Sequence, residues 1–150
     1  MPAEFPMNST NQIVQAAAAC ADVKTLSDTD HQIQALLREF NLGVQASFFA
    51  GGVQGMQQFT TSEGYQVMQK KYANWMSRQV TALNLVSCEF LAFNLTGGGK
   101  ARAWTFEKWV FEYADGKTFP TAGSVDGYDL EQVNGQWRVV SARTYAAEAD

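Results

Sequence analysis

The hydrophobic period of this sequence changes near residue 80, and this change limits what the chain can fold into. Between residues 33 and 48, apolar side chains recur every three or four positions, as on one face of a helix: Ile33, Leu36, Leu37, Phe40, Val44 and Phe48. From Thr81 onward they recur at every second position, which is typical of strands. Helices followed by strands predict an α+β domain in which the helices pack on one face of an antiparallel sheet.

Two long helices are expected before residue 80, in addition to a short N-terminal helix over residues 11–22. Each has a polar N-cap residue, and the first has an acidic residue three positions further on, in the capping-box position. The first ends at a pair of glycines. For the first helix these signals are Ser27 as N-cap, Asp30 in the capping-box position and Gly51-Gly52 at the end. For the second helix the N-cap is Thr61 or Ser62.

A meander of four antiparallel strands is expected in the second half, with its third strand over residues 118–133. The dipeptides Asp115-Gly116 and Asn134-Gly135 favour hairpin turns. Long strands twist and bend, so we expect a curved sheet with a hollow face. The helices fill one end of the hollow and leave a cavity at the other. The chain is expected to form a single domain over residues 1–150, with a core at 28–145 and an N-terminal extension at 1–27.

Composition excludes several classes of function. Eleven Lys plus Arg against fifteen Asp plus Glu give a net charge of −4, which argues against a general nucleic-acid binder. Two Cys and one His exclude a disulfide scaffold and a self-contained zinc site, so neither a metal nor a cofactor is expected. No apolar run approaches the ~18 residues of a membrane span. The N-terminus lacks the features of a signal peptide, and we expect a cytoplasmic protein.

Three segments resemble a known family. Residues 40–59 are similar to a long helix, tight turn and short second helix, and residues 103–113 to a central strand with a Thr-x-Glu-x-Trp alternation. Residues 128–139 are similar to a closing hairpin with the pattern Gly-x-Trp-x-Val. Together they resemble the nuclear transport factor 2-like (NTF2-like) superfamily, also described as SnoaL-like or as the cystatin-like cone fold. The resemblance implies no single activity, because the superfamily contains isomerases, dehydratases, cyclases, epoxide hydrolases and non-catalytic binding proteins.

The expected central strand alternates between two faces, both rich in aromatic side chains. One face holds Ala103, Thr105, Glu107, Trp109, Phe111 and Tyr113. The resemblance implies that the helices cover this face. The opposite face would leave large side chains exposed in a monomer, and such patches mark interfaces. We therefore expect a homodimer through that outer face, at Trp104, Phe106 and Val110.

Glu107 is the main candidate for acid–base chemistry. Burial inside the cone would raise the pKa of its carboxyl group and suit it to proton transfer. The alternative is structural: a hydrogen bond to a tyrosine, or an ion pair with Arg102, Lys108, Arg138 or Arg143. Asp126 shares a face with Tyr128 and is either a second carboxylate of the site or a solvated strand end. His31 is expected to be solvated at a helix start, and Cys88 has no base beside it.

The sequence leaves two functions open. In the first, a non-catalytic homodimer binds an apolar small molecule or a protein segment in its cavity. The side chains expected to line that cavity are Thr105, Glu107, Trp109, Phe111, Tyr128 and Trp137, although the spacing of Tyr128 and Trp137 favours the hydrophobic core. In the second, a cofactor-independent isomerase, dehydratase or cyclase uses Glu107 as acid or base, with Tyr113 or Tyr128 as hydrogen-bond donor.

Overall fold

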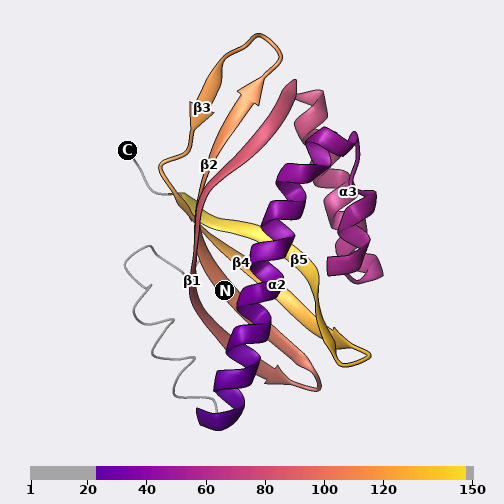
Figure 1. Ribbon diagram of the computed structural model, residues 1–150, viewed down its shortest axis with the longest axis vertical. Coiled ribbons are helices and arrows are strands. Elements are labelled where there is room, and N and C mark those ends of the chain that lie inside the picture. Colours follow the sequence, from indigo (N-terminus) through magenta and orange to yellow (C-terminus); the bar gives the residue numbers. More distant parts are fainter. Residues whose placement is uncertain (1–22, 148–150) are drawn as a thin grey trace.

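Helices and a curved antiparallel sheet make up the computed structural model, which describes residues 23–147 (Figure 1). The helix predicted over residues 11–22 lies outside the described residues. In the described part no helix has both the length and the apolar character needed to cross a bilayer. The elements are α2 (Val23–Ala50), the 3-10 helix η3 (Gln54–Phe59), α3 (Ser62–Ser77), β1 (Val80–Gly97), β2 (Lys100–Tyr113), β3 (Thr118–Pro120), β4 (Ser124–Val133) and β5 (Gln136–Ala147).

The sheet has the order β1-β2-β4-β5, with β3 paired only to the end of β2. All of these pairs are antiparallel, and β1 carries several register shifts against β2. Each shift inserts a bulge, which increases the local twist and bends the strand. The long strands therefore curve, and both α2 and α3 lie on the same side of the sheet (Figure 1). The prediction of an α+β fold with helices on a curved antiparallel sheet is confirmed.

The predicted helix start at Ser27 is wrong, because Ser27 lies inside α2. A capping signal is local, and the helical conformation continues through it. The predicted stop is confirmed, since Gly51 directly follows the helix with a φ of 77°, a conformation that glycine adopts without strain. Thr61 is the N-cap of α3, where its side chain accepts a hydrogen bond from the backbone N–H of Gly64.

The predicted third strand is two strands, separated by Thr121, Ala122 and Gly123. Two properties of the sequence explain the break. Pro120 has no backbone N–H to continue a ladder, and Gly123 has a φ of 135°. The Thr121 hydroxyl instead accepts a hydrogen bond from the backbone N–H of Trp109 at 2.9 Å. The break leaves a short irregular segment beside the middle of β2.

The two faces of β2 have different surroundings. Ala103, Trp109, Phe111 and Tyr113 pack in the main core, to which α2 contributes its apolar face. On the opposite face, Trp104 packs with Ala92 and Val125 in a separate small cluster. The expectation that Trp104 is exposed in a single chain is wrong: only 6% of it is accessible, because side chains of neighbouring strands cover it.

Candidate functional site

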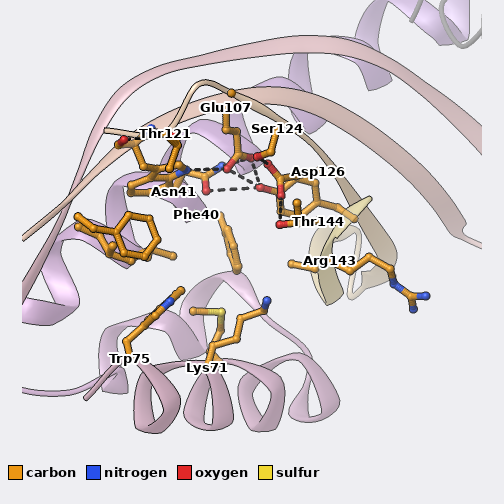
Figure 2. Close-up of a pocket in the computed structure, with 18 of the residues that line it drawn as sticks. Phe40, Asn41, Lys71, Trp75, Glu107, Thr121, Ser124, Asp126, Arg143 and Thr144 are labelled. Carbon is orange, nitrogen blue, oxygen red and sulfur yellow. Dashed lines mark hydrogen bonds between the residues drawn. The ribbon is translucent and has the colours of Figure 1, made fainter. Parts of the chain in front are cut away.

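A cavity of about 480 Å³ lies between α2, α3 and the inner face of the sheet (Figure 2). The polar side chains of Asn41, Glu107 and Asp126 lie on the sheet side, and Lys71 and Trp75 rise from the helix opposite (Figure 2). The cavity is lined by six aromatic rings, those of Phe40, Trp75, Trp109, Phe111, Phe119 and Tyr128, together with aliphatic side chains such as Val44, Met68 and Leu83. The volume and the mixture of apolar walls with a few polar groups are typical of small-molecule sites.

Glu107 is buried and holds together three parts of the fold. Its Oε2 atom accepts hydrogen bonds from Thr105 Oγ1 at 2.6 Å, from Asn41 Nδ2 at 3.3 Å and from the Tyr128 hydroxyl. Its Oε1 atom accepts one from Trp109 Nε1 at 3.0 Å. These donors come from α2, β2 and β4, and all are uncharged. Glu107 thus accepts four hydrogen bonds, about as many as a carboxylate can accept, and they link α2 to β2 and β4 in the manner of a structural brace.

Of the partners predicted for Glu107, a tyrosine or a basic side chain, the structure shows the tyrosine. Among residues 23–147, no ion pair to Glu107 is found. Arg102 and Arg143 instead pair with Asp129, at 2.9 and 3.8 Å. Arg138 donates to the backbone carbonyls of η3. Of the two structural alternatives, the hydrogen bond to Tyr128 is the one present.

Asn41 is a central residue of the site that the sequence analysis missed. It is 2% exposed and lies in the apolar stripe of α2, between Leu37 and Val44. Its Nδ2 atom contacts the Leu37 carbonyl at 3.0 Å and the Tyr128 hydroxyl at 3.1 Å, besides Glu107. The signal that would have found it is an amide at a position where the helical period demands an apolar residue.

Asp126 is the group in the cavity most suited to exchange a proton. Burial, and next the negative charge of Glu107, raise the pKa of its carboxyl group to about 7. Hydrogen bonds from Thr144 Oγ1 at 2.6 Å and Ser124 Oγ at 2.8 Å, and the charge of Lys71, lower the pKa and limit the rise. Near neutral pH the carboxyl group is therefore partly protonated.

Two further groups near the carboxylates stay protonated. Burial and the charge of Glu107 raise the pKa of the Tyr128 phenol well above its usual value, so this group remains a hydrogen-bond donor. The same two causes raise the pKa of the Cys88 thiol to about 12. A thiol with this pKa is a poor nucleophile at neutral pH.

The structure brings together some of the predicted cavity residues and separates others. Glu107, Trp109, Phe111 and Tyr128 line the cavity. Thr105 is fully buried and contacts Glu107. Trp137 packs in the core, and it does not belong to the cavity lining. Tyr113 lines a separate surface hollow beside Arg78 and Lys117 and is not among the hydrogen-bond partners of Glu107.

No protein-family model and no curated protein sequence matches this chain. Several solved structures match this chain, all at low sequence identity. The intermembrane space region of the chloroplast protein ARC6 is 8% identical with a TM-score of 0.63, over 85% of this chain and 98% of that one. An uncharacterized protein from Caulobacter vibrioides with a cystatin-like fold is 14% identical with a TM-score of 0.53, over 77% of this chain and 87% of that one.

A third similar structure is the association domain of C. elegans CaMKII, which is 8% identical with a TM-score of 0.51, over 80% of this chain and 97% of that one. Likeness at these identities establishes the fold and leaves function to be argued from the site. The chain therefore has a cystatin-like fold.

Proposed function

We propose that this protein binds an apolar small molecule in the cavity between α2, α3 and the sheet. The observation that carries the proposal is the cavity itself, about 480 Å³ in volume, with aromatic walls and buried carboxyl groups on one side. Aromatic rings supply flat apolar surface, and a few polar groups fix the orientation of a ligand.

A second candidate is a cofactor-independent enzyme of the isomerase, dehydratase or cyclase type. The observation that favours it is the Asp126 carboxyl group, whose pKa of about 7 suits a general acid or base at neutral pH. In this version Asp126 takes the role first considered for Glu107, because the Oε2 atom of Glu107 is occupied by three donors. Tyr128 remains the donor that stabilises the neighbouring charge.

The binding proposal is tested by filling the cavity. Ala142 lines it, whereas Ala73 is exposed on α3 and does not. We expect the neutral fluorescent probe N-phenyl-1-naphthylamine to bind the native chain saturably at one site. Ala142→Phe should weaken binding at least tenfold, since a ring occupies the space of the ligand, while Ala73→Phe should change affinity less than twofold. Equal affinity of both variants would contradict the proposal.

We also propose that the chain forms a homodimer through the outer face of the sheet, at Phe106 and Val110. Both side chains are partly exposed, although Trp104 on the same face of β2 is already covered. The association domain of C. elegans CaMKII has a similar fold, and this supports the proposal that two copies of this chain associate. Sedimentation velocity should give twice the chain mass of 16.5 kDa for the native protein and the monomer mass for Val110→Glu. Gln136→Glu, an exposed control, should remain dimeric, and a native monomer would refute the proposal.

A further inference from the structure

We propose that the cavity selects a cationic amine, an apolar molecule whose protonated amino group lies against Asp126 and the surrounding aromatic rings. This inference rests on the proposed binding function and names the chemical class of the ligand. It is carried by the charges of the cavity, by its aromatic walls and by the unused hydrogen-bonding capacity of one carboxyl group.

The carboxyl groups of the cavity are held by uncharged donors. Glu107 accepts from two hydroxyls, an amide and an indole, and Asp126 accepts from the hydroxyls of Ser124 and Thr144. In the described part of the chain no Lys or Arg forms an ion pair with either of them. Neutral donors stabilise a carboxylate but leave its net charge in place, so the cavity favours a ligand of opposite charge.

The cationic side chains that line the cavity are Lys71 and Arg143. The guanidinium group of Arg143 points away from the cavity (Figure 2) and pairs with Asp129 at 3.8 Å. Lys71 extends from α3 toward the cavity, and its charge acts on Asp126. The cavity thus holds two carboxyl groups and one ammonium group. That ammonium group, on Lys71, lies across the cavity from the carboxyl groups.

The aromatic walls favour a cation for a second reason. A positive charge held over the face of an aromatic ring is attracted by the ring quadrupole, most strongly by tryptophan. Trp75 of α3 and Trp109 of β2 both line the cavity, together with Phe40, Phe111 and Phe119. An anion of the same size would gain no such attraction from a ring face and would also meet the charge of Glu107.

Asp126 has room for the ligand's amino group, whereas Glu107 does not. Each oxygen of Asp126 accepts one hydroxyl bond, which leaves further acceptor capacity on both oxygens. Glu107 already accepts four hydrogen bonds, about as many as a carboxylate can accept, whereas Asp126 accepts two. An ammonium group therefore binds Asp126 directly, and Glu107 adds long-range attraction.

Binding of a cation should depend on pH. The ionisable groups around Asp126 are Glu107 on β2, Cys88 on β1, Lys71 on α3 and Tyr128 on β4, while the Arg143 guanidinium on β5 points away and pairs with Asp129. Of these, the Cys88 thiol and the Tyr128 phenol stay neutral below pH 9. Asp126 itself ionises near pH 7, so a cation should bind more tightly as the pH rises from 5.5 to 8.

The test compares three ligands of one shape: 1-naphthylmethylamine, 1-naphthalenemethanol and 1-naphthoate. By isothermal titration at pH 8, the amine should bind about tenfold or more tighter than the alcohol, and the acid should not bind. At pH 5.5 the affinity of the amine should fall about tenfold, whereas that of the alcohol should change less than twofold.

Two variants separate charge from shape. Asp126→Asn should reduce the preference for amine over alcohol to less than threefold and remove its pH dependence. Lys71→Met removes the competing ammonium group, so affinity for the amine should rise at least threefold. Binding of N-phenyl-1-naphthylamine by each variant shows that its cavity is intact. Equal affinity for amine and alcohol, or tighter binding of the acid, would overturn the amine proposal alone. Failure of the neutral probe and all three ligands to bind the native chain would overturn the binding function as well.

Discussion

Glu107→Ala is expected to lower the free energy of unfolding by roughly 3–5 kcal/mol, a large part of the stability of a domain of this size. The substitution leaves four donors without their acceptor: the buried Thr105, Asn41 and Tyr128, and the partly buried Trp109. A buried donor that loses its partner costs about 1–3 kcal/mol, and water entering from the cavity offsets part of the sum. Urea unfolding followed by tryptophan fluorescence measures the loss.

The matched control for this experiment is Glu89→Ala. Glu89 is exposed on β1, next to β2, and its substitution should change stability by less than about 0.5 kcal/mol. Glu107→Gln keeps the shape and one acceptor oxygen, so its stability should lie between those of the native chain and Glu107→Ala. A loss of less than about 1 kcal/mol for Glu107→Ala would mean that Glu107 is not the brace of the fold.

The second large effect is a dependence of stability on pH that comes from Asp126. Its pKa rises from the model-compound value of 3.8 to about 7 in the folded chain, so the folded state binds more protons between these values. Its contribution to stability is complete below pH 4 and is lost as the pH rises through 7. Between pH 5 and pH 8 this loss should amount to about 2–3 kcal/mol.

Asp126→Asn should remove this contribution, since an amide does not titrate. The variant should therefore gain stability relative to the native chain as the pH rises from 5 to 8, by the same amount. Asp28→Asn, an exposed substitution on α2, should follow the native chain at both pH values. The measurement is urea unfolding of all three proteins at each pH. A native-to-Asp126→Asn difference that is equal at pH 5 and pH 8 would show that Asp126 titrates normally.

The fold was predictable because periodicity is a local property of the sequence. The spacing of Leu37, Phe40 and Val44 defines a helix without any knowledge of its partner, and the alternation along β2 defines its two faces. The helix start predicted at Ser27 was wrong because a capping signal is weaker than the tendency of a helix that has already begun to continue. The break after Pro120 was missed because the turn signals on either side were read as bounding one strand.

The site was harder to predict because it depends on register between distant segments. Glu107 and Tyr128 were singled out, but their mutual hydrogen bond arises from the pairing of β2 with β4, which alternation alone does not fix. Asn41 reaches the same carboxylate across 66 residues of sequence. Lys71 faces Asp126 only because α3 packs on the same side of the sheet as α2.

The four tryptophans offer the most direct test of cavity binding. Trp75 and Trp109 line the cavity, whereas Trp104 and Trp137 lie in the outer cluster and in the core. Their indole N–H signals, assigned by single Trp→Phe variants, are followed by ¹H–¹⁵N correlation spectra as N-phenyl-1-naphthylamine is added. Binding in the cavity predicts that the signals of Trp75 and Trp109 shift and saturate together while the other two stay in place. Shifts confined to Trp104 and Trp137, or no shift at all, would contradict it.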